Sequence, residues 1–206
     1  MKRTNLSLAT IIIAVISMAA CNSSNSSSEE SAQEETESVE RDLSYYETLG
    51  DSMVMIAQTK LLSELQNSME TSGLNEAVKY CNVNAIGIME LLSDEYDVQF
   101  RRSSIRYRNP ADASIEHEQG VLEEWQTMAE SGDKPIPFAE YLSENQIAYY
   151  SPIYIGAELC LKCHGVEGET LDPEVKETIS TLYPADLATG YELGEFRGIW
   201  SLSFNL

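Results

Sequence analysis

Apolar residues recur at helical spacing through the first half of the sequence. Between residues 43 and 65 an apolar or small residue occupies every third or fourth position, which predicts a long amphipathic helix. After a break at ETSG, a second stripe between residues 74 and 92 predicts another helix, and Cys81 lies within this stripe. A third helix is predicted by a cluster of apolar residues further along the chain. Its members are Ile115, Val121, Leu122, Trp125 and Met128.

Alternating patterns in the remainder of the chain predict strands. Residues 97–110 alternate and end at the turn signal Asn109–Pro110. Residues 146–156 predict another strand, which Pro152 would confine to an edge or a bulge. Residues 196–206, FRGIWSLSFNL, alternate strictly and are the clearest strand. With helices first and strands mostly later, the pattern predicts an α+β fold with an antiparallel sheet.

The N-terminus has the pattern of an export signal. Lys2 and Arg3 precede an apolar run that is shorter than the roughly 20 residues of a membrane-spanning helix. Small residues then lead into Cys21, so SMAAC resembles a bacterial lipobox. Residues 1–20 are therefore predicted to be a lipoprotein signal peptide and Cys21 the lipidated residue, although an ordinary signal with a coincidental cysteine is the alternative. We expect a protein anchored to the bacterial cell envelope by lipid, facing the periplasm or the cell exterior.

Composition divides the remainder into two parts. Residues 21–40 are polar, with six glutamates and no basic residue, which predicts a disordered acidic tether. Residues 41–206 are long enough for one domain with its own core, carrying 11 lysines and arginines against 28 aspartates and glutamates. The resulting charge of −17 argues against nucleic acid as a partner and allows a basic protein partner.

Half of the cysteines lie in one short motif, because Cys160, Cys163 and His164 follow the spacing C-x-x-C-H. This is the attachment signature of c-type haem, in which two thiols bond one edge of the macrocycle and the adjacent imidazole binds the iron. The attachment takes place outside the bacterial cytoplasm, which agrees with the export signal. The sequence therefore predicts one covalent haem c in each chain.

Two other chemistries use closely spaced thiols. A structural zinc site needs four ligands, and beyond the motif the chain after Cys21 offers only Cys81 and His117. A dithiol redox centre would leave His164 without a role. Both alternatives are weaker than haem attachment.

The second ligand of the iron is less well defined by the residues alone. Cys81 lies in the apolar stripe of the second helix, so it is either a small core residue or a thiolate ligand opposite His164. A methionine sulfur is the usual competitor, and Met53, Met55 and Met89 lie at positions expected to face inward. His117, between two glutamates, is expected to be an exposed surface residue.

Arginines cluster in the predicted strand of residues 97–110. On a strand, Arg102, Arg106 and Arg108 would share one face. They would either form a solvated strand edge or pair with the haem propionates, for which guanidinium geometry is well suited.

Four segments together resemble a domain-of-unknown-function family of exported haem-c proteins with a PAS-like fold, known from cyanobacteria and other bacteria. The segments are AVKYCN, RSSIRYRNP, CLKCHG and YPADLATGYELGEFRGIWS, in this order. Members of the family continue the second segment as RNPaNaP, where this chain has Asp112 and Ser114. The resemblance implies a PAS-like antiparallel sheet flanked by helices, with long helices at the N-terminus. It also implies that His164 and Cys81 are the two ligands of the iron.

Two functions from different classes follow. With iron bound on both faces, the expected role is electron transfer to an unidentified redox partner through a six-coordinate haem. The alternative is a redox or gas sensor for CO or NO that signals through a partner protein, which the PAS-like resemblance suggests by analogy only. A haem peroxidase would need a vacant iron site and a distal acid–base residue, for which the sequence offers no candidate. The chain is therefore not expected to be an enzyme.

Overall fold

The computed structural model describes the backbone of residues 27–206 and the side chains of residues 43–206. The predicted signal peptide, residues 1–20, and the predicted lipidation site, Cys21, lie outside the described residues. Within residues 27–206, no helix is both long enough and apolar enough to cross a membrane.

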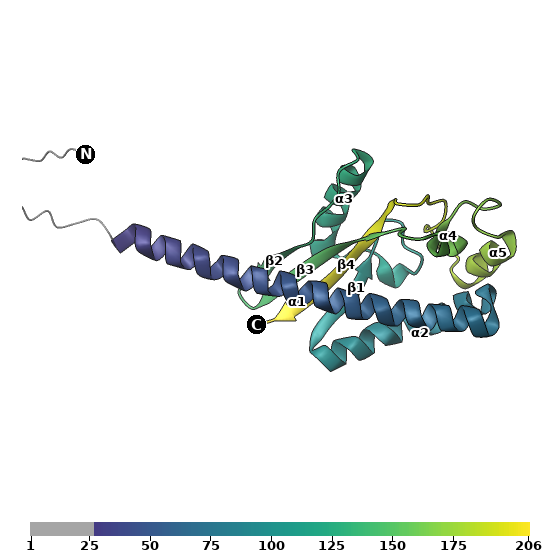
Figure 1. The fold of residues 1–206 in the computed structure, drawn as a ribbon, viewed down its shortest axis with the longest axis horizontal. Helices are drawn as coiled ribbons and strands as arrows, with labels where there is room; N and C mark the ends of the chain where they lie inside the picture. Colours follow the sequence, from purple (N-terminus) through teal and green to yellow (C-terminus); the bar gives the residue numbers. More distant parts are fainter. Residues whose placement is uncertain (1–26) are drawn as a thin grey trace, which may run out of the picture. The chain divides into compact units, whose positions relative to one another are not determined.

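Helices and strands are interspersed along the described part of the chain, and the strands form one antiparallel sheet (Figure 1). The helices are α1 (Ser27–Ser72), α2 (Leu74–Tyr96), α3 (Glu116–Glu130), α4 (Glu158–His164) and α5 (Pro173–Leu182), with a 3-10 turn η1 (Pro110–Asp112). The strands are β1 (Val98–Ser103), β2 (Phe138–Ser143), β3 (Gln146–Tyr154) and β4 (Phe196–Asn205). The three helices and the C-terminal strand that hydrophobic spacing predicts are confirmed.

The four strands form one sheet in the order β1-β4-β3-β2, with every neighbouring pair antiparallel. β4 is internal and its side chains are buried on both faces. β3 is internal over its first half, between β4 and β2, whereas the sequence predicts an edge or a bulge at Pro152. The pairing of β2 with β3 ends at Tyr150, however, so Pro152 pairs only with Ile199 of β4. A residue without an N–H donor is tolerated there because no second neighbour needs the hydrogen bond.

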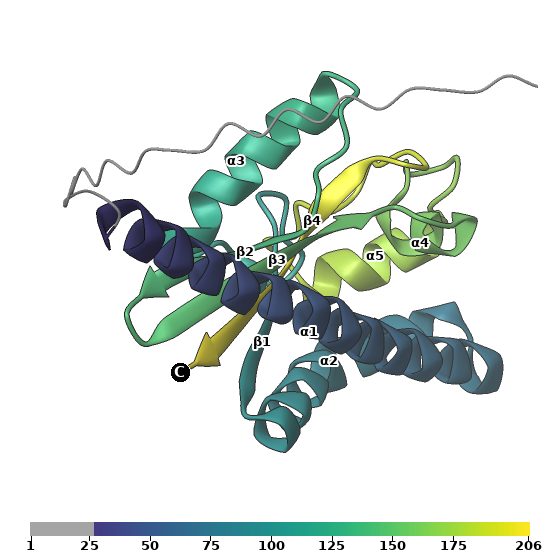
Figure 2. The same ribbon diagram turned by 60° about the vertical axis from the view of Figure 1, so that its left-hand side comes forward.

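Each face of the sheet has its own apolar core. On one face, Met53 and Ala57 of α1 and Leu92 of α2 pack with Trp200 and Leu202 of β4. On the other face, Leu122 and Trp125 of α3 pack with alternate residues of β3 and β4, including Tyr150 and Ile199. Figure 2 shows α1 crossing the strands and α4 and α5 close to one another. A third cluster joins α2 to α5 through Val78, Leu171, Val175, Ile179 and Tyr183.

The predicted acidic tether differs from the structure in part. α1 begins at Ser27, so residues 27–40 are helical and not disordered. No glycine or proline occurs between Ser27 and Leu49, and glutamate, glutamine and alanine are good helix formers. The helix that the apolar stripe predicts from residue 43 therefore extends back into the acidic segment. It ends where predicted, at Gly73, whose φ of 84° is in the left-handed region.

The predicted strand of residues 97–110 is shorter than expected. β1 ends at Ser103, because the backbone N–H of Ser104 donates to the carbonyl of Asp112 instead of to a neighbouring strand. The hydroxyl of Ser104 also donates a 2.7 Å hydrogen bond to the carbonyl of Arg197. Arg106 and Arg108 therefore lie in a loop, and the prediction that they share a strand face with Arg102 is wrong.

Candidate functional site

The C-x-x-C-H motif lies in a helix. α4 is a single short helix that ends with the motif. Cys160 is partly buried against a small cluster formed by Ile155, Leu161, Ala188 and Tyr191. Cys163 packs against the cluster between α2 and α5. Both cysteines are free thiols, as is Cys81.

Gly165 terminates this helix in a closely packed position. A Cβ at residue 165 would lie 2.0 Å from Oγ1 of Thr170 and 2.6 Å from the carbonyl oxygen of Leu161. The carbonyl of Gly165 accepts a 2.8 Å hydrogen bond from the backbone N–H of Gly190, and the carbonyl of His164 accepts a 2.9 Å hydrogen bond from the backbone N–H of Tyr191. The end of the motif is thus held against the segment that leads to β4.

The imidazole of His164 has one nitrogen committed. Nδ1 lies 2.7 Å from the carbonyl oxygen of Ala188, and because a carbonyl can only accept, Nδ1 carries the proton. Nε2 is therefore the nitrogen with the lone pair. Burial and the nearby Arg108 guanidinium hold the pKa of His164 well below its usual value, which keeps the ring neutral. A neutral histidine held through one nitrogen is the usual arrangement of a metal ligand.

Arg108 and Asp186 form an ion pair next to Ala188, the residue whose carbonyl His164 contacts. Nε of Arg108 donates a 3.1 Å hydrogen bond to Oδ1 of Asp186, and the side chains are 13% and 2% exposed. Nη2 of Arg108 donates to the carbonyls of Cys163 at 2.5 Å and Ala188 at 3.2 Å. Arg108 therefore connects the end of α4 to residues 186–188.

Arg106 contacts the same segment but is more exposed. Its guanidinium donates to the carbonyl of Leu187 at 3.2 Å and also to that of Thr189, and it stacks 3.9 Å from the ring centre of Tyr191. Its Nε and Nη2 groups are therefore occupied by the protein backbone.

Arg102 has a donor without a partner. Its buried Nε makes no hydrogen bond within the described residues, and its ion pair with Asp112 is long, at 3.9 Å. Buried polar atoms are rarely left unpaired, so this nitrogen is a candidate contact for a ligand.

Arg197 is a second cation beside Arg102 that the sequence analysis does not identify. It lies where the pairing of β3 with β4 shifts by one residue, between the pairs Ile153 with Gly198 and Tyr154 with Phe196. Its Nη1 donates a 2.6 Å hydrogen bond to the hydroxyl of Ser104. Burial, followed by the neighbouring arginines 108 and 102, lowers its pKa. A glycine inside a strand pattern, here Gly198, is the sequence signal for such a bulge.

Cys81 lies on α2, one turn after Val78, which packs in the same cluster as Cys163. Its thiol is partly buried and lies close enough to Cys163 to raise the pKa of that thiol. Burial raises the pKa of Cys81, and the positive charges of Arg102 and Arg108 act in the opposite direction. The structure thus brings Cys81 to the same cluster of residues as the motif.

The competing sulfur and imidazole ligands lie elsewhere. Met53 and Met89 belong to the core between the sheet and helices α1 and α2. Met55 is 70% exposed, so its predicted inward position is wrong. His117 is partly buried rather than exposed, and its Nδ1 lies 2.8 Å from the hydroxyl of Tyr150. No group of three or more histidine, cysteine or acidic side chains within the described residues is arranged to bind one metal ion.

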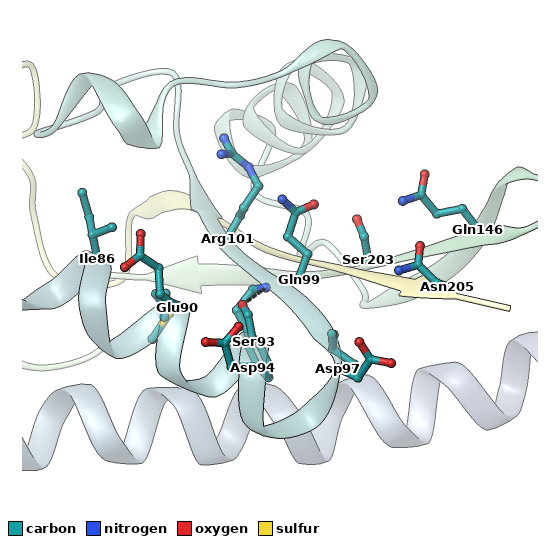
Figure 3. A pocket seen from close by; sticks show the side chains of 13 residues that line it. Ile86, Glu90, Ser93, Asp94, Asp97, Gln99, Arg101, Gln146, Ser203 and Asn205 are labelled. Carbon is teal, nitrogen blue, oxygen red and sulfur yellow. Dashed lines mark hydrogen bonds between the residues drawn. The ribbon is translucent and has the colours of Figure 1, made fainter.

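A surface depression of about 530 Å³ lies apart from the motif. Figure 3 shows that its wall is formed by the second half of α2, with Glu90 and Asp94, and by β1, with Gln99 and Arg101. Arg101 forms an ion pair with Glu118 of α3, with 2.9 Å between Nε and Oε1. None of the three motif residues lines this depression.

The structure defines an α+β domain in which an antiparallel sheet is flanked by helices and a short C-x-x-C-H helix lies beside α2 and α5. The chain belongs to the Tll0287-like family, whose model matches residues 14–205. The fold is similar to that of a solved structure described as the cyanobacterial heme-protein Tll0287, with a TM-score of 0.53 and 22% sequence identity. The similarity covers 77% of this chain and 95% of that one. No curated protein sequence gives a significant match. The predicted fold class is confirmed.

Proposed function

We propose that this chain is a lipid-anchored monohaem c-type protein of the bacterial envelope that transfers electrons through a six-coordinate haem. The observation that carries the proposal is the hydrogen bond from Nδ1 of His164 to Ala188, which directs the lone pair to Nε2. Cys163 packs against the cluster between α2 and α5, Cys160 packs against the cluster that contains Ala188, and Cys81 lies close enough to Cys163 to affect its pKa. The solved relative, described as a heme-protein, has the same fold.

The residues fit a haem in three separate ways. Cys160 and Cys163 supply the two thiols for covalent attachment. His164 would supply a neutral imidazole and Cys81 a thiolate as the two protein ligands of the iron. Arg102 supplies an unpaired buried Nε that suits a carboxylate. When bound, the haem supplies a one-electron couple, and a thiolate ligand favours its ferric state.

Charge around the site supports an anionic ligand. Arg102, Arg108 and Arg197 are close enough to affect one another, in a protein whose overall charge is −21. Asp112 and Asp186 are the carboxylates paired with this group. Arg108 is occupied by Asp186 and by backbone carbonyls, which leaves Arg102 and Arg197 as the propionate contacts. For Arg106 and Arg108 the sequence leaves a solvated strand edge and pairing with the propionates open, and we assign both side chains to the surrounding backbone.

The side chains of the site have defined tasks. His164 is held neutral by burial and held in one tautomer by Ala188, so it binds metal without first losing a proton. The apolar cluster of α2 and α5 excludes water from the side of Cys163. The lipid anchor at Cys21 and the envelope location are supported by the signal pattern and the lipobox in the sequence.

Exposure of the reduced protein to CO tests electron transfer against sensing. If both His164 and Cys81 stay bound, the reduced spectrum remains that of a six-coordinate haem and CO leaves it unchanged. A CO adduct that forms rapidly at low CO pressure would contradict the electron-transfer proposal. It would favour the alternative, a redox or gas sensor in which Cys81 leaves the iron.

A further inference from the structure

We propose that Arg108 and Asp186 form a clamp that positions His164 toward the iron by fixing the Ala188 carbonyl. The inference rests on the proposed haem function and adds two positioning residues to it. Neither residue would touch the haem iron, because both act through the peptide groups of residues 186–188.

Ala188 is fixed on both of its peptide groups. Its N–H donates a 3.0 Å hydrogen bond to Oδ1 of Asp186, and its carbonyl accepts from Nη2 of Arg108 at 3.2 Å. The same carbonyl accepts the proton of Nδ1 of His164. The orientation of the imidazole is therefore set by an acceptor that is itself held by an ion pair.

Arg108 also connects the acceptor to the helix that carries His164. Its Nη2 contacts the carbonyl of Cys163, the residue directly before His164. One guanidinium thus holds both ends of the hydrogen bond, the α4 backbone and the Ala188 carbonyl. A point charge such as a lysine ammonium lacks the planar fork that makes these three contacts together.

The buried carboxylate of Asp186 needs Arg108 as its partner. Its side chain is 2% exposed, and its second oxygen, Oδ2, makes no hydrogen bond within the described residues. Lys176 lies 3.7 Å from Oδ2, which is an ion pair without hydrogen-bond geometry. Removing Arg108 would leave the buried carboxylate with only the N–H of Ala188 and the more distant Lys176 as partners, and the segment carrying Ala188 would move.

The chain offers a matched control in Arg101. Its guanidinium also pairs with a buried carboxylate, Glu118, and with a backbone carbonyl, Ala113, at 2.9 and 3.0 Å. This pair lies on the α3 side of the sheet and makes no contact with residues 186–188. Loss of either arginine should cost stability, but only loss of Arg108 should affect His164.

The test uses full-length haem-loaded protein carrying Cys81→Ala, so that His164 is the protein ligand that remains. Acid releases the imidazole with uptake of one proton, and the midpoint is read from the Soret band. Partners of a metal-bound histidine typically change ligand affinity by roughly 10- to 100-fold, which moves this midpoint up by about 1–2 pH units. We expect this shift for Arg108→Met and Asp186→Asn, and none for Arg101→Met at a similar loss of thermal stability.

Two outcomes would overturn the clamp. One is an unchanged midpoint in Arg108→Met, or in Asp186→Asn should Arg108→Met fail to take up haem. The other is full recovery by Arg108→Lys, which would assign the effect to charge at a distance and not to the forked contacts. A parent protein that takes up no haem at all would instead overturn the proposed function, so the two failures are distinguishable.

Discussion

The thiol of Cys81 on α2 lies close enough to the thiol of Cys163 on α4 to raise its pKa, although the two residues lie far apart in the sequence. Cys163 packs against the apolar cluster that joins α2 to α5, and Cys81 lies one helical turn after Val78, a member of that cluster. This relationship places the proposed second iron ligand beside the motif that would attach the haem.

Replacement of Cys81 tests its role as a ligand. We expect Cys81→Ala and Cys81→Ser to shift the ferric Soret band and to raise the reduction potential, because a strong electron donor to ferric iron is lost. The measurements are absorption spectroscopy and potentiometric titration. The serine variant nearly preserves the side-chain volume, so a change common to both variants reports the lost thiolate. An unaltered spectrum in both would show that Cys81 is only a core residue.

Removal of Arg102 tests the propionate contacts. We expect Arg102→Leu and Arg197→Leu to lower the reduction potential, because loss of a nearby positive charge favours the more positively charged ferric state. Arg106→Leu is the control, since its guanidinium is bound to backbone carbonyls and stacked on Tyr191. Equal shifts in all three variants would argue against specific contacts from Arg102 and Arg197.

Substitution of Gly165 tests how closely the chain is packed directly after the motif. A methyl group there would overlap Thr170 and the Leu161 carbonyl, so Gly165→Ala should lower the free energy of unfolding by roughly 1–3 kcal/mol. It should also reduce the fraction of chains that carry haem. Gly87→Ala is the matched control, because open space surrounds that position on α2, and alanine there should stabilise the helix by about 1 kcal/mol. Denaturant unfolding measures both, and a Gly165→Ala variant as stable as the parent would contradict the packing described.

Glu118 gives a pH dependence that is independent of haem. Burial alone would raise its pKa, but hydrogen bonds from Arg101 and from the N–H of Ile115 outweigh burial and lower it below 4.5. The stabilising contribution of the carboxylate is therefore complete above pH 4.5 and is lost as the pH falls through the lower pKa of the folded state.

The corresponding measurement compares the free energy of unfolding of the parent with that of Glu118→Gln between pH 7 and about 3. The parent should be more stable at pH 7, and the difference should shrink below pH 4.5. Glu124→Gln, at an exposed position on the same helix, should give a small and constant difference. A difference for Glu118→Gln that stays constant down to pH 3 would refute the assignment.

Much of the fold is predictable because its signals are local. The stripe that contains Cys81 predicts α2 from spacing alone, and the alternation of residues 196–206 predicts β4. β2, in contrast, is short and partly exposed, and its apolar pattern is too weak to indicate a strand. β1 ends at Ser103 because Ser104 bonds to Arg197 and Asp112, and such distant partners leave no trace in local spacing.

The site also contains residues that the sequence reveals and residues that it does not. The spacing of Cys160, Cys163 and His164 is visible in the sequence, because the chemistry requires neighbours. The acceptor for His164 is a backbone carbonyl, and its residue type, alanine, carries no signal. Strand spacing predicts that Arg108 shares a face with Arg102, but β1 ends early and Arg108 pairs with Asp186. The positions of the arginines depend on tertiary structure and not on strand periodicity.

The most direct test of the central claim is extraction of exported, matured protein with acidified organic solvent, followed by quantification of haem on the remaining chain. We expect one haem per chain to stay with the polypeptide. Cys160→Ala and Cys163→Ala should each lose a thioether bond, and the double variant should release all of its pigment. Colourless protein, or pigment that passes entirely into the solvent from the unaltered chain, would contradict covalent attachment of haem.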